Sequence, residues 1–207
     1  MLPMTFDPWT QVTTRRGLPA DEVISALQKE IRRGHAENAA LLAYELSTTS
    51  RELEQKMWDR LCVISVEDIG FGDVSAPVLI ESLDRLRQRF QYGEGDRTVF
   101  AIHAARYLCG CAKDRSSDEM LNWMRMSDAR PESQPVIPDY AVDMHTRRGI
   151  ELGRGTLDFL NEGSRVAPEL AKRDTTYRKR ILQLVKPDSG AKGGKTKQKR
   201  RSKSAWR

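Results

Sequence analysis

Residues 21–34 read Asp-Glu-Val-Ile-Ser-Ala-Leu-Gln-Lys-Glu-Ile-Arg-Arg-Gly, and most of the chain repeats the same kind of pattern. Its apolar side chains recur at intervals of three and four, which places them on one face of an α-helix. They are Val23, Ile24, Leu27 and Ile31. Gly34 suits the left-handed residue that commonly ends a helix. The segment therefore predicts an amphipathic helix over residues 21–33.

Similar periodicity predicts further helices in succession along the chain. They are expected at residues 36–47, then from the capping box at Thr49 to the break at Gly70, and at 73–90, 96–112, 116–126 and 139–152, near 157–161, and at 168–185. Two of them begin with the spacing of a capping box, at Thr49 and at Ser116. Gly70-Phe71-Gly72 is expected to break the third helix. Because no segment alternates as a half-buried strand does, the predicted fold is an all-α helical bundle.

Charge is distributed unevenly along the chain. Residues 186–207 contain nine Lys and Arg against Asp188 alone, a net charge of +8, whereas the remaining 185 residues carry 26 basic and 28 acidic side chains, a net charge of −2. Since this basic end also lacks periodic apolar residues, we expect it to be disordered. The predicted organisation is an N-terminal extension over residues 1–17, one helical domain over 18–185 and a basic tail over 186–207.

Several classes of protein are excluded by composition. No stretch approaches the roughly 18 apolar residues of a membrane span. Residues 1–16 hold prolines and arginines and no continuous apolar run, so no secretory signal is expected. Three cysteines do not make a disulfide framework and fit a reducing compartment. We therefore expect a cytoplasmic protein.

The familiar signatures of enzymes and cofactor sites are missing. Gly193-Gly194-Lys195-Thr196 resembles the end of a phosphate-binding loop, but Ser189 stands where that loop needs its first glycine. The cysteines lie in apolar surroundings and are expected to be structural, as is His103 in the helix predicted over residues 96–112. No serine or cysteine occupies a recognisable nucleophile motif. The sequence therefore predicts no catalytic residue, no cofactor and no metal.

Residues 138–155 concentrate charged side chains that allow three interpretations. The first is a salt-bridged helix face, because acids and arginines stand four residues apart. The second is an anion site, in which planar guanidinium groups contact phosphates; its residues would be Arg147, Arg148 and Arg154. The third is a divalent metal site for hydrolysis, with ligands Asp143, His145 and Glu151.

Glu67 and Asp68 are expected to close the third helix. The macrodipole disfavours negative charge at the C-terminal end of a helix. Two adjacent acids at that position therefore indicate a specific partner, and we expect a buried ion pair with an Arg or Lys from elsewhere in the chain. A catalytic role for the pair is the alternative.

The basic tail carries the clearest functional signal by charge. Its cations could neutralise phosphates and release counterions, which gives sequence-independent, salt-sensitive binding to nucleic acid. The residues expected to do so are Lys195, Lys197, Lys199, Arg200, Arg201 and Lys203. Trp206 could stack on an unpaired base. The alternative is a tail that keeps the protein soluble or docks a protein partner.

Blocks within residues 20–120 resemble a known family. Residues 23–32 read Val-Ile-Ser-Ala-Leu-Gln-Lys-Glu-Ile-Arg, residues 38–41 Asn-Ala-Ala-Leu, residues 60–61 Arg-Leu, and residues 65–70 Ser-Val-Glu-Asp-Ile-Gly, followed by Asp73 and Ala76. Tyr107-Leu108 with Lys113 continues the pattern. These blocks are similar to the C-terminal helical region of the MgsA/RarA-type AAA+ ATPases, the replication-associated recombination proteins.

The resemblance implies a fold like the clamp-loader collar, self-association as a tetramer, and a setting in replication, recombination and repair. It does not imply ATP hydrolysis, because no Walker loop precedes Asp21. Fold alone does not fix function. The expected protein is a non-enzymatic, homo-oligomeric accessory protein that contacts DNA and replication–repair proteins. Its rivals are a metal-dependent hydrolase, built on the three metal-ligand candidates above, and a protein-interaction adaptor that binds no nucleic acid.

Overall fold

A computed structural model describes residues 7–185 of the chain, and every regular element within that range is helical. The all-α prediction is confirmed for these residues, where the one β-type feature is an isolated bridge between Thr13 and Pro19. None of the described helices combines the length and the apolar character that a membrane span requires. The predicted basic tail, residues 186–207, lies outside the described residues.

The chain divides into two compact units, with the boundary between Ser133 and Gln134, within the range for which the sequence predicts one helical domain. The first, unit 1, contains the 3₁₀ helix η1 (Pro8–Gln11), α1 (Ala20–Arg33), α2 (Ala36–Thr49), α3 (Arg51–Ile64), the π turn η2 (Ser65–Ile69), the 3₁₀ turn η3 (Gly70–Gly72), α4 (Ala76–Arg87), α5 (Gly95–Gly110), α6 (Ser116–Ser127) and η4 (Pro131–Ser133).

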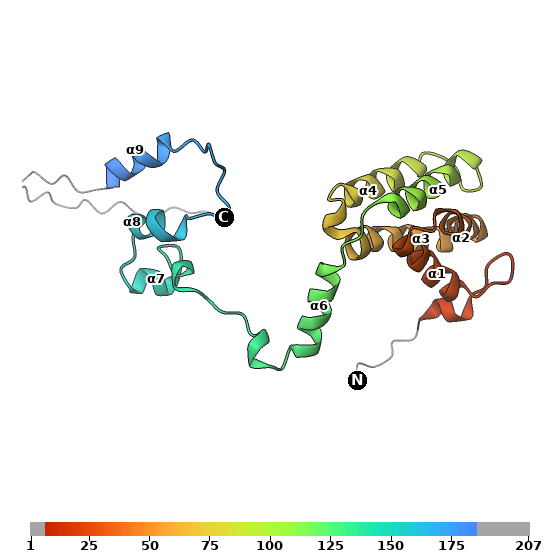
Figure 1. Ribbon diagram of the computed structural model, residues 1–207, viewed down its shortest axis with the longest axis horizontal. Helices are drawn as coiled ribbons and strands as arrows, with labels where there is room; N and C mark the ends of the chain where they lie inside the picture. Colours follow the sequence, from red (N-terminus) through yellow and green to blue (C-terminus); the bar gives the residue numbers. More distant parts are fainter. Residues whose placement is uncertain (1–6, 186–207) are drawn as a thin grey trace, which may run out of the picture. The chain divides into compact units, whose positions relative to one another are not determined.

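Helices α1 to α5 of unit 1 surround one hydrophobic core (Figure 1). Helix α5 packs against both α2 and α4, and small residues on its buried face allow this close approach. These residues are Ala101, Ala104 and Ala105. His103 is exposed on the opposite face, so the prediction that it is a core residue is wrong. Residues two apart on a helix point in nearly opposite directions. Because the alanines of α5 pack against α2, His103 faces away from the core.

The side chains that cap α3 and α6 are not the predicted ones. Helix α3 begins at Arg51, and the hydroxyl of Ser50 accepts the backbone N–H of Leu53. Thr49 cannot cap it, because Thr49 is the last residue of α2. Helix α6 begins at Ser116, and the side chain of its N-cap residue, Arg115, makes no capping hydrogen bond. The carboxylate of Asp114 accepts the N–H of Ser116 instead.

A buried ionic network joins α3, α4 and α5 within the core of unit 1. Glu54 accepts hydrogen bonds from Arg97 and pairs with Arg87 at 2.9 Å, and both Glu54 and Arg87 are almost fully buried. The guanidinium of Arg87 also lies over the ring of Trp58. Nothing in the sequence spacing indicated this network, because its members lie on three helices.

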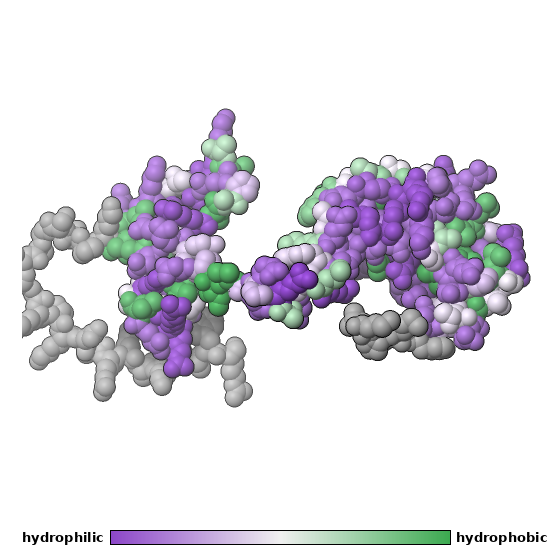
Figure 2. Space-filling model, turned by 60° about the horizontal axis from the view of Figure 1, so that its bottom comes forward, coloured by the Kyte–Doolittle hydropathy of each residue, from purple (hydrophilic) through white to green (hydrophobic). Residues whose placement is uncertain are grey.

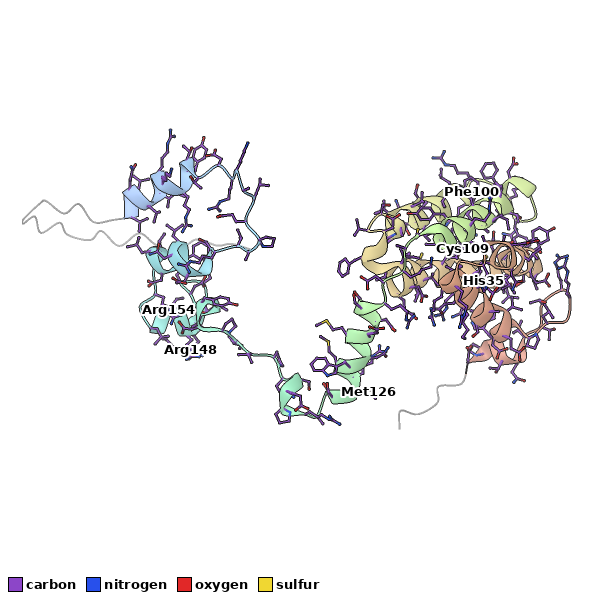
Figure 3. The ribbon with its side chains drawn as sticks, in the orientation of Figure 1. His35, Phe100, Cys109, Met126, Arg148 and Arg154 are labelled. Carbon is purple, nitrogen blue, oxygen red and sulfur yellow. The ribbon has the colours of Figure 1, made fainter. Side chains whose placement is uncertain are left out.

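Helix α6 leaves the five-helix bundle, and its described contacts in unit 1 are with η2 and η4 (Figure 1). Figure 2 shows a mostly hydrophilic face on unit 1, with hydrophobic side chains gathered toward the edges. The apolar residues of α6 stay exposed, among them Met126, which Figure 3 labels. Since a stable helix normally buries its apolar face, α6 presents a surface that unit 1 leaves uncovered.

Unit 2 has short elements and few buried apolar residues. Its described elements are η5 (Asp139–Ala141), α7 (Arg147–Glu151), α8 (Thr156–Asp158), the π turn η6 (Phe159–Gly163) and α9 (Thr176–Val185). Within its described part, the buried hydrophobic residues are Val142 and Leu160. With so small a core, unit 2 gains little stability from hydrophobic burial.

Two helices predicted in unit 2 are shorter than expected. The predicted helix over residues 139–152 is interrupted, because Asp143 accepts the N–H of His145 and Thr146 then caps α7 by accepting the N–H of Gly149. The predicted helix over residues 168–185 begins only at Thr176, whose N–H is accepted by Asp174. Side-chain to backbone hydrogen bonds of this kind compete with helix continuation.

Candidate functional site

Asp68 is the centre of a polar cluster that joins α1, η2 and the start of α6. The residue is fully buried. Its Oδ1 atom accepts from Arg32 Nε at 2.5 Å and from Arg115 Nη1 at 2.6 Å, while its Oδ2 atom accepts from Gln28 Nε2 at 2.9 Å. The prediction of a buried ion pair with arginines from elsewhere in the chain is therefore confirmed.

Glu67 shares the same partners at the edge of this cluster. Its Oε1 atom accepts from Arg32 and Arg115, each at 3.2 Å, and from Gln28 at 2.9 Å. Arg115 also pairs with Asp118 in the first turn of α6. Arg115 therefore fixes the base of α6 against η2.

The cluster holds Asp68 in its charged form. Burial would raise the pKa of Asp68, but hydrogen bonds from Arg32, Gln28 and Arg115 outweigh burial and lower it. Both oxygens of Asp68 already accept from a cation or an amide, and the side chain has no exposed surface for a substrate to reach. The cluster is therefore suited to holding helices together, and its geometry gives no support to the catalytic alternative.

A second group of motif residues lies at the start of α4. Asp73 accepts the hydroxyl of Tyr107 at 2.7 Å and the hydroxyl of Ser75 at 2.6 Å. The hydrogen bond with Ser75 would lower the pKa of Tyr107, but burial and the carboxylate of Asp73 together raise it to about 12. Lys113 donates to carbonyl oxygens at the end of α5, including that of Leu108 at 2.9 Å. These residues connect helix ends, which is a structural role.

A groove runs beside the Asp68 cluster, between α3–η2 and α6, with a volume of about 460 Å³. Its apolar lining comprises Val63, Val66 and Leu121, which are about half exposed, and Cys62, which is partly buried. Its polar lining is Glu67, Ser117 and Asp118. We call this the α3–α6 groove.

The pKa of the Cys62 thiol reflects the electrostatic surroundings of the α3–α6 groove. Burial raises its pKa first, and the negative charges of Asp84, Glu81 and Asp59 raise it further. A raised pKa suppresses the thiolate, so Cys62 is not an activated nucleophile. The groove thus combines an apolar lining with acidic surroundings.

A second set of apolar side chains on α6 forms a stripe. Met120, Trp123 and Met124 stand at positions i, i+3 and i+4, which share one helix face. Their exposed fractions are 57%, 48% and 43%. Methionine and tryptophan are enriched at protein interfaces, because each offers a large apolar surface with adaptable geometry. We call these three residues the α6 stripe.

The arginines predicted to bind phosphate have different surroundings in unit 2. Arg147 is 93% exposed and pairs with Glu151 at 3.0 Å, and Arg148 is exposed. Arg154, which Figure 3 labels, is only 23% exposed; it pairs with Asp139 and donates to the carbonyl oxygens of Asp139 and Val142. Arg154 therefore holds the segment of residues 139–142 in place. The predicted tail residues, Lys195 to Lys203, lie outside the described residues, so their role stays a prediction.

The three candidate metal ligands are not brought together. Asp143 and His145 are 3.1 Å apart, and the ring of His145 lies edge-on to Phe159, whereas Glu151 turns to Arg147. Between residues 7 and 185, no three His, Cys, Asp or Glu side chains are grouped so that they could hold a metal ion. The hydrolase alternative has no geometric support in this part of the chain.

Sequence reasoning missed Arg115, Gln28 and the α6 stripe. The first two complete the Asp68 cluster, but only the folded chain shows which cations reach a given acid. The stripe had a signal in the sequence, since residues 116–126 hold five large apolar side chains in a short segment.

Comparison of this chain with models of protein families and with curated proteins found no match.

Proposed function

We propose that the chain is a non-enzymatic assembly module, which self-associates through the α6 stripe and contacts nucleic acid through the basic segment 186–207. The observation that carries the proposal is an uncovered apolar helix face on an otherwise well-packed unit. The setting we propose is replication, recombination and repair, as the family resemblance implies. Copies joined through unit 1 would present several basic segments together, which raises their effective concentration at one nucleic acid.

The α6 stripe supports self-association through its size and position. Monomeric proteins rarely leave contiguous large apolar side chains exposed, because their burial lowers the free energy by about 25 cal/mol per Å². The same surface on two copies can pair about a two-fold axis, which is the commonest arrangement in homo-oligomers. Arg115 fixes the base of α6, so the stripe is presented on an anchored helix.

The distribution of charge supports nucleic-acid contact through the C-terminal part of the chain. Residues 1–133 hold 17 basic and 21 acidic side chains, whereas residues 134–185 hold nine basic and seven acidic ones. The net charge therefore runs from −4 through +2 to the +8 of residues 186–207. A polyanion is repelled by unit 1 and attracted by residues 186–207. Arg147 and Arg148 offer two further exposed cations for it to contact.

Self-association is tested by replacing Trp123 and Met124 with Glu in the full chain. We expect the wild-type protein to show a molar mass that rises with concentration in light scattering, and the double variant to remain a monomer. The control is Val78→Glu, at an exposed apolar position of α4, which should behave as wild type. A wild-type protein that is monomeric at every concentration would contradict this part of the proposal.

Nucleic-acid contact is tested by replacing Lys197, Lys199, Arg200, Arg201 and Lys203 with Gln and titrating DNA at several salt concentrations. We expect weaker binding and a shallower slope of log K against log salt, by up to about 0.9 for each phosphate that the variant no longer neutralises. The control replaces two exposed arginines of unit 1, Arg85 of α4 and Arg89 just after it, and should leave the slope unchanged. Equal affinity of the Gln variant and the wild type would remove the segment from the proposal.

A further inference from the structure

Arg60 of α3 is half-buried and has no carboxylate partner within residues 7–185. Its guanidinium makes one hydrogen bond in that range, from Nη1 to the Oε1 atom of Gln28 on α1 at 3.4 Å. Each of the other buried or half-buried arginines of unit 1 pairs with a carboxylate at 2.9 Å or less; they are Arg32, Arg87, Arg97 and Arg115. Because arginine stays protonated in proteins and a partly buried charge without a partner costs free energy, Arg60 has donors left for an anion.

Two lysines lie near Arg60 along the contact between α1 and α3. Lys56 stands four residues before Arg60, so both lie on the face of α3 that meets α1. The side chain of Lys56 is also half-buried, and in the described part of the chain it forms no ion pair or hydrogen bond. On α1, Lys29 follows Gln28, and its Nζ atom donates to the hydroxyl of Ser25. We call these residues the α1–α3 seam: Ser25, Gln28, Lys29, Lys56 and Arg60.

The acids around the α1–α3 seam have partners of their own. Glu67 and Asp68, at one end of the seam, are paired within the Asp68 cluster. Asp59 accepts from the amide of Gln55 at 3.0 Å, and Glu52 accepts a hydroxyl at the start of α3. The positive charge of the seam is therefore not balanced by these acids.

The donors of the α1–α3 seam match a doubly charged tetrahedral anion. A guanidinium can donate to two oxygens of one phosphate, and an ammonium supplies a further donor. A phosphate monoester carries a charge of about −1.5 to −2 at pH 7, which two or three cations can balance. Unit 1 has more acidic than basic side chains and so repels a long polyanion, whereas a small anion experiences mainly the charges within about 8 Å at physiological salt.

We infer that the α1–α3 seam binds the phosphate group of a small phosphomonoester. Arg60 donates to two phosphate oxygens, Lys56 donates to a third, and Lys29 adds positive charge at the rim. Since a ligand that binds only the folded chain stabilises it, the bound phosphate also strengthens unit 1. The inference goes beyond the proposed function, because it uses neither the α6 stripe nor residues 186–207.

The test is a titration of the full chain with methyl phosphate, followed through the backbone amide signals of α1 and α3 in ¹H–¹⁵N NMR spectra. We expect saturable shifts centred on residues 25–29 and 56–60. Lys56→Gln combined with Arg60→Gln should weaken binding about tenfold or more, the loss expected for one charge-assisted hydrogen bond. The matched control combines Arg89→Gln with Arg106→Gln, at two exposed positions of unit 1, and removes the same charge without changing the affinity.

Arg60→Lys separates the geometry of the guanidinium from its charge. This variant keeps the positive charge and loses the donation to two oxygens, so its affinity should lie between those of the wild type and the double Gln variant. The dispersion of the same spectra shows that each variant is folded. Equal losses in the double Gln variant and its control, or amide signals that do not move at any concentration, would overturn the inference.

A comparison of methyl phosphate with dimethyl phosphate identifies the source of the phosphate group. Dimethyl phosphate has the single charge of a nucleic-acid backbone linkage, so we expect it to bind more weakly. Equal affinity for the two would assign the α1–α3 seam to nucleic acid and overturn the inference of a small ligand. The Gln variant of residues 186–207 should keep the shifts caused by methyl phosphate, so failure of the proposed nucleic-acid contact leaves this result intact.

Discussion

Asp68 has no exposed surface, and its charge is balanced by Arg32 and Arg115 with the help of Gln28. Moving a charge from water into the protein interior costs free energy, and that cost is offset only when the partners of the charge are close and well oriented. The residues that supply these partners belong to α1 and to the turn before α6. One side chain thus couples three parts of unit 1.

Replacing Asp68 with Asn should destabilise the protein by about 1–3 kcal/mol, because Arg32 and Arg115 lose a charged acceptor while Glu67 and Asp118 remain as their partners. The measurement is denaturant unfolding at neutral pH. The control is Glu81→Gln, which breaks an exposed pair with Arg85 and should cost about 0–1 kcal/mol. Equal costs for the two variants would show that the Asp68 cluster contributes no more than a surface pair.

The pKa of Asp68 also predicts how stability depends on pH. A carboxyl group with a lowered pKa in the folded state stabilises the protein above its unfolded value of about 3.9 and loses that contribution as pH falls through its folded pKa. The stability difference between wild type and Asp68→Asn should therefore be constant from pH 7 to about 5 and shrink below about 4. Thermal unfolding across this range measures it, and a difference that grows on acidification would contradict the assignment.

At the scale of elements, two glycines let the turn after α3 lie against the segment that leads into α6. A Cβ on Gly72 would clash with the carbonyl oxygen of Ala112, and one on Gly70 with that of Asp114. Gly70 also has a φ of +51°, which favours glycine. The N–H of Asp114 donates to the carbonyl oxygen of Asp68 at 3.0 Å, so this approach positions the whole polar cluster.

Gly72→Ala should therefore destabilise unit 1 by about 1–3 kcal/mol, because the new methyl group forces two backbone segments apart. Denaturant unfolding of the full chain measures the change. Gly110→Ala serves as the control: it lies at the end of α5 with open space around it, and should be neutral or stabilising by up to about 1 kcal/mol. A neutral Gly72→Ala would show that the two segments can separate freely.

At the scale of the whole molecule, the hydrophobic core lies within unit 1 and extends from Ala20 to Cys109. The described part of unit 2 buries Val142 and Leu160 and otherwise depends on polar links such as the pairing of Arg154 with Asp139. A core of that size offsets little chain entropy. The two units should therefore differ widely in stability.

A chain ending at Ser133 should keep the helical content of unit 1 and unfold cooperatively near the temperature of the full-length protein. Circular dichroism with thermal unfolding measures this. Residues 134–185 produced alone should show little cooperative unfolding, because few apolar side chains are buried there. Loss of cooperativity in the chain ending at Ser133 would mean that unit 1 depends on the rest of the protein.

The helices of unit 1 and the need of Asp68 for a cationic partner follow from the sequence alone. Apolar spacing over residues 21–33 has a period that only a helix satisfies, and an acid at a helix C-terminus has a local electrostatic cost. Both depend on residues near one another in the chain. The uneven charge of residues 186–207 is likewise a property of sequence, independent of any fold.

Only the tertiary structure decided which residues meet. Asp68 lies 36 residues from Arg32 and 47 from Arg115, and no local pattern selects those arginines over the others. Packing against α2 left His103 exposed, and side-chain hydrogen bonds from Asp143 and Thr146 interrupted the helix expected over residues 139–152. Such outcomes depend on the balance between the free energy of long-range packing and that of local hydrogen bonds. The packing contribution is set only when distant parts of the chain come together in the folded protein.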